Sequence, residues 1–141
     1  MSKRCVFCDI IYSDSSDIIV CRDSQQTAFL DKRPLFFGHV LLVPNQHIET
    51  FDALPQESIL PYFLTAQRLA TAIPKAVDAV GTFVAMNNRV SQSVAHLHLH
   101  IVPRNVKDGL RGFFWPRKKY ESDSQMRQIA ANIRDALEKV F

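Results

Sequence analysis

The sequence predicts an α+β fold in which helices pack on an antiparallel sheet. Three observations support this class. Five short runs have strand character, two longer stretches carry apolar residues at helical spacing, and the elements follow the order strands, helix, strands, helix. The length of 141 residues suits one domain with one hydrophobic core.

The strands are predicted from β-branched and aromatic runs that are bounded by polar residues, glycine or proline. Gly38 opens the third run, Pro44 closes it, and Pro103 ends the last one. The five runs are DIIVCRD (17–23), QTAFLD (26–31), GHVLLVP (38–44), GTFVAMNN (81–88) and AHLHLHIVP (95–103).

The first helix is predicted between residues 56 and 80, where apolar residues recur at intervals of three and four. Pro61 and Pro74 fall within this span. Because proline has no backbone N–H, each must lie in a first helical turn or cause a kink.

A second helix is predicted from about residue 124 to 139, with Ser122 and Gln125 as a capping box. Its apolar positions recur at helical spacing and are predicted to form a buried stripe. These positions are Met126, Ile129, Ala130, Ile133, Leu137 and Val140.

The composition, with 47% hydrophobic and 22% charged residues, is that of an ordinary globular protein. No apolar run approaches the ~18 residues of a membrane span, so we expect no membrane association. The N-terminus MSKRCVFCDI does not resemble a signal peptide, and we expect a cytoplasmic location. The net charge of +3 would help an anionic substrate approach, but it is too small to indicate nucleic acid.

Three cysteines, Cys5, Cys8 and Cys21, are an odd number in a chain without a secretion signal. This count favours free thiols or metal ligands over a disulfide framework. The CxxC pair of Cys5 and Cys8 is half of a tetrahedral zinc site, and His47 with one histidine of a row described next would complete it.

Three of the five histidines, His96, His98 and His100, alternate with apolar residues in one predicted strand. Side chains of a strand alternate between its faces, so the three rings share one face and form a row. Such a row can bind a metal, supply a nucleophile or acid–base pair, or lie on a partly exposed face. If the strand that begins near His39 is a neighbour, His39 joins the same site.

Four motifs occur in order: CVFCDII (5–11), AFLDKRPLFFGHVLLVPNQH (28–47), NN (87–88) and SQSVAHLHLHIVPR (91–104). Together they resemble the histidine-triad (HIT) family of nucleotide hydrolases and transferases, most closely its bacterial Hint-like branch. HLHLHIV matches the family signature His-φ-His-φ-His-φ-φ at every position, where φ is apolar. The resemblance implies one HIT domain over residues 1–141, with its motifs in 5–104 and a C-terminal loop and helix in 105–141.

The activity that the resemblance implies is hydrolysis at the α-phosphate of an adenylated substrate, which is a purine nucleotide derivative. Dinucleoside polyphosphates and nucleoside phosphoramidates are the implied substrates. His98, the middle histidine, would attack the phosphorus and form a nucleotidyl-histidine intermediate that water then hydrolyses. A backbone carbonyl of the same strand would fix its tautomer.

Further site residues follow from the same resemblance. His100 and His39 would hydrogen-bond phosphoryl oxygens or assist the leaving group, and Asp31 would hold the ribose hydroxyls. Three polar residues would contact the phosphate, partly as donors to its developing charge: Asn87, Gln92 and Ser93.

A structural zinc ion and a homodimer are also implied. The zinc ligands of related proteins correspond to four residues that are all present here: Cys5, Cys8, His47 and His96. Members of the family form homodimers whose antiparallel sheets join across the interface. We therefore expect a HIT-like sheet with two helices that extends across a homodimer.

The chain departs from the family in the loop before the histidine row. The family has a glycine-rich loop there, whereas NNRVSQSVAH has no glycine. Backbone that lies close to a phosphate favours glycine. Arg89 is the loop's cation, and we predict that it contacts the polyphosphate or leaving group in place of glycine amides, although a solvent-exposed Arg89 is an equal alternative.

Three rival functions remain open at the level of sequence. A nucleotidyltransferase would pass the same intermediate to another phosphate. A nucleotide-binding or interaction protein would have little catalysis, and a metallohydrolase would hold a catalytic metal on the histidine row. The segment GLRGFFWPRKKY (109–120) is either a lid near the nucleotide or a cover of the sheet edge.

Overall fold

The computed structural model describes residues 4–14, 17–111 and 117–140. The chain divides into two compact units, Met1–Asp108 and Gly109–Phe141, each described by itself below. None of the described helices is both long enough and apolar enough to cross a membrane. The organisation of residues 1–141 as one domain stays a prediction.

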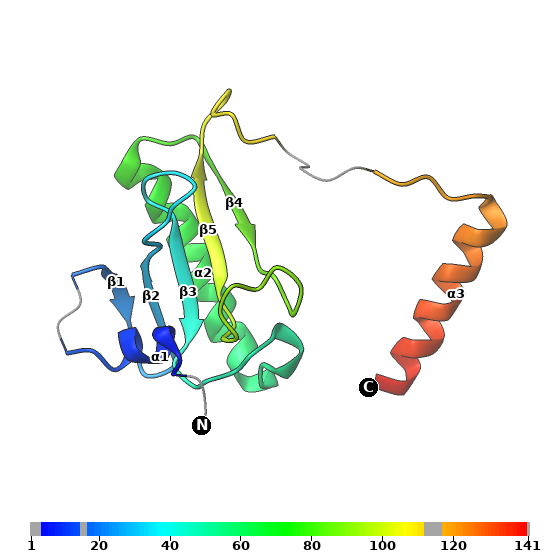
Figure 1. Ribbon diagram of the computed structural model, residues 1–141, viewed down its shortest axis with the longest axis horizontal. Helices are drawn as coiled ribbons and strands as arrows, with labels where there is room; N and C mark the ends of the chain where they lie inside the picture. The colour runs from blue at the N-terminus through cyan, green and yellow to red at the C-terminus, as the bar shows by residue number, and fades with distance from the viewer. Residues whose placement is uncertain (1–3, 15–16, 112–116, 141) are drawn as a thin grey trace. The chain divides into compact units, whose positions relative to one another are not determined.

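The first unit contains a five-stranded antiparallel sheet in the order β1-β2-β3-β5-β4 (Figure 1). This confirms the α+β class and all five strands. The strands are β1 (Ile19–Arg22), β2 (Gln26–Leu30), β3 (Val40–Pro44), β4 (Gly81–Ala85) and β5 (Leu99–Arg104). β5 begins later than predicted because the Leu97 N–H donates to the Ile48 carbonyl at 2.7 Å, outside the sheet.

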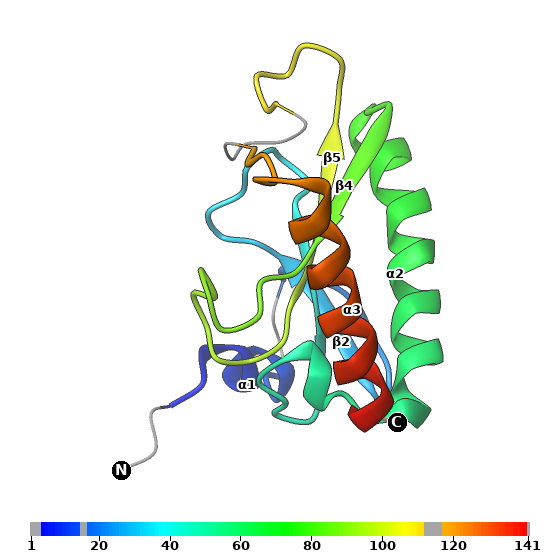
Figure 2. The ribbon, with the colours of Figure 1, turned by 90° about the vertical axis from the view of Figure 1, so that its right-hand side faces the viewer.

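Two helices cover opposite faces of this sheet (Figure 2). The long helix α2 (Gln56–Val77) packs on one face, where the buried Tyr62 donates its hydroxyl to the Leu42 carbonyl at 2.7 Å. The short helix α1 (Val6–Ile11), which the sequence did not predict, packs Phe7 and Ile11 on the other face. Each side of the sheet therefore has its own hydrophobic cluster.

Helix α2 runs through both prolines as one element. Pro61 is its sixth residue and Pro74 lies in its last turn, so neither proline takes the first of the two predicted alternatives, a place in a first helical turn. The helix ends at Asp78, a left-handed C-cap, and the Ala79 N–H donates to the Pro74 carbonyl at 2.8 Å. It tolerates two missing backbone donors because a buried stripe anchors it to the sheet: Tyr62, Ala66, Leu69 and Ile73.

A tight turn leads into β3 and places His39 at its start. The His39 N–H donates to the Phe36 carbonyl at 3.0 Å, and Gly38 has a φ of +99°. A Cβ at Gly38 would lie 2.9 Å from Cγ1 of Val77. Glycine is therefore required here for both backbone conformation and space.

The second unit contains helix α3 (Asp123–Val140). Ser122 Oγ accepts the Gln125 N–H at 3.0 Å, while Gln125 Oε1 accepts the Glu121 N–H at 2.8 Å, which confirms a reciprocal cap. Within this unit the predicted stripe is not buried, since α3 has no buried residue. Among its described residues, this unit has no second helix or strand on which the stripe could pack.

The predicted lid or edge cover at 109–120 lies partly outside the described residues, which exclude 112–116 and with them Phe113, Phe114 and Trp115.

Candidate active site and metal centre

The three histidines of the row share one face of the segment, and the apolar residues between them share the other, as predicted. His96 and His98 are buried on the α1 side, where the His98 ring lies 5.1 Å from the Phe7 ring, centroid to centroid. The apolar residues between them enter the cluster with α2: Leu97, Leu99 and Ile101. His96 and His98 precede the hydrogen-bonded part of β5, so the row begins in the loop and ends in the strand.

One tautomer of His98 follows from its backbone contact. Its Nδ1 lies 2.7 Å from the His96 carbonyl oxygen. A carbonyl oxygen only accepts hydrogen bonds, so Nδ1 carries the proton and donates. In the neutral ring the other nitrogen, Nε2, therefore carries the lone pair, which a nucleophilic imidazole requires.

A hydrogen-bonded chain also fixes the tautomers of His39 and His100. The Leu35 N–H donates to His39 Nδ1 at 3.1 Å, so the proton of neutral His39 is on Nε2. That proton is donated to His100 Nδ1 at 2.9 Å. The proton of His100 is consequently on Nε2, where it is available as a donor.

Burial keeps both of these rings neutral at pH 7. Desolvation lowers the pKa of His39, although the nearby Asp31 opposes this shift. The pKa of His100 falls to about 4, mainly through desolvation and then through the neighbouring His98 and His39. His100 therefore presents its Nε2–H to the site as a neutral donor.

The hydrogen bonds from Leu35 through His39 to His100 also argue against a catalytic metal at these histidines. Asp31, His39 and His100 offer ligand atoms within 4.8 Å of one another, and Asp31 Oδ2 lies 3.7 Å from His39 Nε2. A metal would need the lone pair of His39 Nε2, which requires the proton on Nδ1. The Leu35 N–H occupies that side, so the cluster fits a hydrogen-bonded chain better than a metallohydrolase centre.

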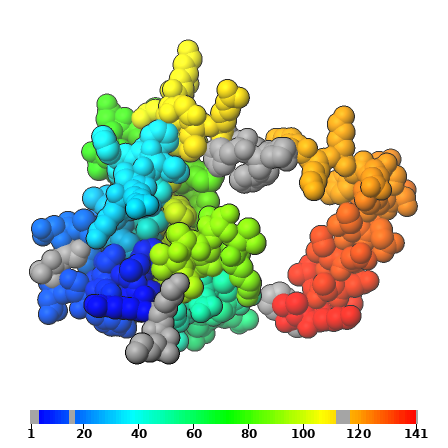
Figure 3. Space-filling view, viewed as in Figure 1, coloured from blue at the N-terminus to red at the C-terminus, as the bar shows by residue number. Residues whose placement is uncertain are grey.

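A cavity of about 680 Å³ opens beside these histidines. Asp31, Ser93, His98 and His100 line its polar side, and Phe7 contributes to its apolar side. Figure 3 shows α1 (dark blue) and the loop before the row side by side on one face of the first unit. Polar groups that converge on an apolar cavity are typical of a ligand site.

The structure separates two of the predicted phosphate ligands from this cavity. Gln92 donates its amide to the Glu49 carbonyl at 2.6 Å and lines a neighbouring cavity beside His47. Asn87 is exposed and is not among the cavity's lining residues, and the adjacent Asn88 accepts the Phe51 N–H at 2.7 Å.

The Arg89 side chain is exposed, as one of the two predicted alternatives has it, and it pairs with Asp52 at the surface. Its two terminal nitrogens lie 3.3 and 3.0 Å from the two carboxylate oxygens. This contact holds the pKa of Asp52 down, at about 2.

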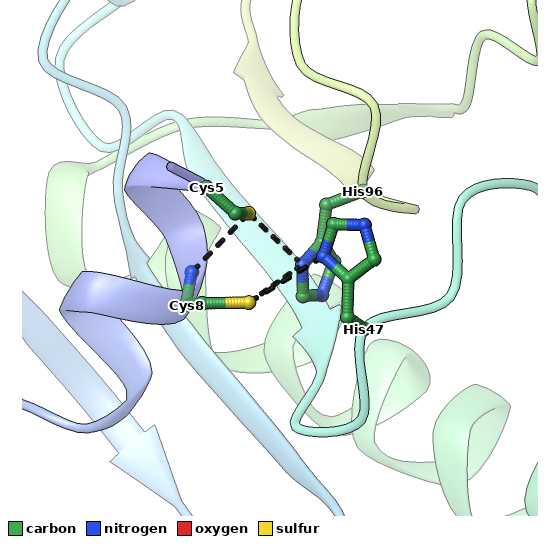
Figure 4. Close-up of side chains that lie close together, drawn as sticks. All are labelled: Cys5, Cys8, His47 and His96. Atoms are coloured by element: carbon green, nitrogen blue, oxygen red, sulfur yellow. Dashed lines mark hydrogen bonds between the residues drawn. The ribbon is translucent and has the colours of Figure 1, made fainter. Parts of the chain in front are cut away.

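Two cysteines and two histidines form a second cluster (Figure 4). Cys5 Sγ lies 3.4 Å from His96 Nδ1, and Cys8 Sγ lies 3.4 Å from His47 Nδ1 and 3.7 Å from His96 Nδ1. Tetrahedral zinc with Zn–S of about 2.3 Å and Zn–N of about 2.0 Å separates sulfur from nitrogen by roughly 3.6 Å. The spacing of the four ligand atoms therefore fits zinc.

The chemistry of this cluster fits the same ion. His96 Nε2 donates to the Pro44 carbonyl at 2.8 Å, which directs the lone pair of Nδ1 at the sulfurs. Cys5 caps α1 by accepting the Cys8 N–H at 3.4 Å. Burial, followed by the adjacent Cys5, raises the pKa of the Cys8 thiol to about 11, so a bound cation would be needed to deprotonate it.

The sequence prediction missed helix α1 and the roles of Phe7 and Leu35. The apolar spacing of Phe7, Ile10 and Ile11 is helical, but it covers less than two turns and gives a weak signal. The contribution of Leu35 is a backbone N–H, which no side-chain pattern reports.

This sheet, with its buried histidine row beside a cavity, is the arrangement of the histidine-triad class. The model of the HIT domain family matches residues 13–107. The chain belongs to the HIT family.

Relatives extend over nearly the whole chain. Adenylylsulfatase HINT3 of Arabidopsis thaliana is 32% identical over 141 residues, which cover 95% of this chain and 70% of that protein. The crystal structure of a HIT-family member from Bacillus subtilis is 31% identical with a TM-score of 0.83, and the match covers 94% of this chain and 96% of that one. A Zn-bound histidine triad protein from Mycobacterium smegmatis is 31% identical with a TM-score of 0.70 and the same coverage.

Proposed function

We propose that this protein hydrolyses adenylated substrates at the α-phosphate through a nucleotidyl-histidine intermediate on His98. Dinucleoside polyphosphates and nucleoside phosphoramidates are the first candidate substrates. The similarity to an adenylylsulfatase adds adenylyl sulfate as a third. All three have a leaving group on the phosphorus of adenosine monophosphate.

One observation carries this proposal: the 2.7 Å contact between His98 Nδ1 and the His96 carbonyl oxygen. In the neutral ring it leaves the lone pair on Nε2, and this buried ring lines the cavity. In the first step, Nε2 forms a bond to phosphorus as the bond to the leaving group breaks. In the second step, water breaks the nitrogen–phosphorus bond, releases the nucleotide and restores the lone pair.

His100 and His39 assist without forming a covalent bond. The Nε2–H of His100 donates to a phosphoryl oxygen or protonates the leaving group. His39 fixes the tautomer of His100 through their 2.9 Å contact.

Asp31 and Ser93 bind the nucleotide from the cavity wall. The Asp31 carboxylate accepts from the ribose hydroxyls, and Ser93 donates to the phosphate. Asn87 contacts the phosphate only if the loop moves, because it does not line the cavity.

Cys5, Cys8, His47 and His96 would hold a structural zinc ion, which would tie α1 to the histidine row. A zinc ion there would supply a crosslink and no chemical step, because the nucleophile is the imidazole of His98.

A homodimer and a cytoplasmic location complete the proposal. Strand β4 is at the edge of the sheet and has β5 as its one neighbour among the described strands, and a second copy of β4 could pair with it. The three cysteines have free thiols, which suits a reducing compartment. Light scattering during gel filtration tests the dimer.

The test of the proposed function is a turnover screen with adenosine phosphoramidate, diadenosine polyphosphates and adenylyl sulfate. Rapid quenching under alkaline conditions and mass spectrometry should detect an adenylyl adduct on the peptide that contains His98. Release of free nucleotide in water indicates a hydrolase, whereas transfer to added phosphate indicates a transferase. No turnover and no adduct with any substrate would refute the proposal.

A further inference from the structure

The loop between β4 and the histidine row adopts left-handed backbone without glycine. Arg89 has a φ of 68° and Ser91 has a φ of 58°. The sequence has no glycine between Gly81 and Gly109. Left-handed backbone is unfavourable for residues with a side chain, so other contacts must hold this loop.

Gln92 supplies two of these contacts from one side chain. Its Nε2 donates to the Glu49 carbonyl at 2.6 Å, and its Oε1 accepts the Arg89 N–H at 2.9 Å. The first bond ties the loop to the segment after His47, and the second closes the loop on itself. Both ends of the amide are therefore engaged.

Arg89 and Asn88 tie the loop to the same segment. Both terminal nitrogens of Arg89 face the carboxylate of Asp52, in the bidentate arrangement that best restrains two side chains. Asn88 Oδ1 accepts the Phe51 N–H at 2.7 Å. The guanidinium faces the 3-10 turn Phe51–Ala53, and it is not among the residues that line the cavity.

The restrained loop leads directly into the cavity wall. Ser93 and Val94 follow Gln92 and line the cavity with His98 and His100. The Leu97 N–H then donates to the Ile48 carbonyl at 2.7 Å, so the end of the loop rests on the same segment as its beginning. A displacement of this loop would carry Ser93 away from the phosphate position.

We propose that Arg89 and Gln92 are positioning residues that, with Asp52 and the Glu49 carbonyl, form a clasp in place of loop glycines and hold Ser93 at the phosphate. The clasp consists of Glu49, Asp52, Arg89 and Gln92. This inference rests on the proposed function. Arg89 and Gln92 would then contact other residues of the protein, not the phosphate that the sequence predicted for them.

A double-mutant cycle separates the clasp from a direct phosphate contact. Arg89→Ala, Asp52→Ala and the double variant are compared by kcat/KM on a diadenosine polyphosphate and on adenosine phosphoramidate. If the two residues act only through each other, both single variants lose the same factor, the double variant loses no more, and the two substrates are affected equally. A larger loss for Arg89→Ala than for Asp52→Ala, confined to the polyphosphate, would overturn the proposal.

Gln92 is tested by glycine rescue. Gln92→Ala should lower kcat/KM roughly 30-fold, the effect of two lost hydrogen bonds. Adding Ser91→Gly should restore part of the loss because glycine favours positive φ. Gln128→Ala, which removes an exposed glutamine of α3 that bonds Asn132, is the matched control and should change nothing. Failure of Ser91→Gly to restore any activity would contradict the positioning role.

Hydrogen exchange tests the clasp independently of turnover. Amides of residues 91–94 should exchange faster in Asp52→Ala and Gln92→Ala, while amides of β2 and β3 stay as in the wild type. If the wild-type protein hydrolyses none of the substrates, the proposed function fails and exchange alone decides on the clasp. Unchanged exchange in both variants would refute it.

Discussion

His96 connects the metal cluster to the proposed nucleophile, His98. The His96 ring faces the thiols of the cluster, while its carbonyl oxygen accepts the His98 Nδ1–H at 2.7 Å. His96 thus contacts both the thiols and the His98 ring. The Pro44 carbonyl, which accepts from His96 Nε2, fixes the orientation of the His96 ring. The ion that we expect at the cluster would hold the carbonyl that sets the tautomer of His98.

Replacing His98 by alanine should abolish turnover and leave nucleotide binding nearly unchanged. The ring forms the covalent bond but contributes little to ground-state affinity, so we expect kcat to fall at least about 10³-fold. Single-turnover kinetics and calorimetric titration with adenosine monophosphate measure the two effects. A variant that keeps a substantial part of the wild-type rate would show that another group is the nucleophile.

Zinc should be present at about one ion per chain in protein purified without chelators. Replacing Cys5 and Cys8 by serine removes the two thiolates that crosslink α1 to the histidine row. Even a loss of about 3 kcal/mol in the free energy of unfolding would lower Tm by roughly 10 °C. The specific activity of the folded variant should fall less, because the zinc takes part in no chemical step.

Elemental analysis and a thermal melt test this expectation. Cys21→Ser is the control, because Cys21 is an exposed free thiol that is not part of the metal cluster. Metal-free wild-type protein with an unchanged Tm would exclude the site.

Local pattern was sufficient to predict the strands and the histidine row. Alternating Leu97, Leu99 and Ile101 fix the face of His98, and Gly38 and Pro44 mark the limits of one strand. The ligand set at the CxxC pair came from the family resemblance, because residues 5 and 96 meet only through tertiary structure.

Other features could not be predicted because they depend on backbone groups. The tautomer of His100 follows from the Leu35 N–H through His39, and the role of Gln92 follows from the Glu49 carbonyl. The stripe of α3 has a helical period, but a period cannot tell whether a partner covers it.

Tyr62→Phe should destabilise the first unit without changing the site. The Tyr62 hydroxyl is buried and donates to the Leu42 carbonyl at 2.7 Å, on the face of the sheet that carries α2. Its removal leaves a buried acceptor short of one partner, which costs about 1–2 kcal/mol. Urea unfolding should show a lower midpoint at an unchanged m-value, with KM as in the wild type. An unchanged midpoint would mean that the bond contributes no net stability.

Acid should destabilise the protein through His100. Its pKa falls from 6.5 to about 4 on folding, so the unfolded chain binds a proton between these values while the folded chain does not. Its contribution to stability is therefore complete above pH 6.5 and is lost as the pH falls toward about 4. Protonation at Nδ1 would also place two N–H groups against each other at the 2.9 Å contact with His39, which ends the chain that orients the donor.

His100→Gln isolates this effect from the carboxylates that titrate in the same range. Glutamine does not titrate, so the variant should lose less Tm than the wild type between pH 6.5 and about 4, and the difference in slope is the contribution of His100. Thermal melts at half-unit pH steps provide the measurement. His47→Gln is not a suitable control because it removes a candidate zinc ligand, whereas Gln128→Ala on α3 is suitable because it changes no titrating group. Parallel Tm–pH curves for wild type and His100→Gln would show that His100 titrates alike in the folded and unfolded chain.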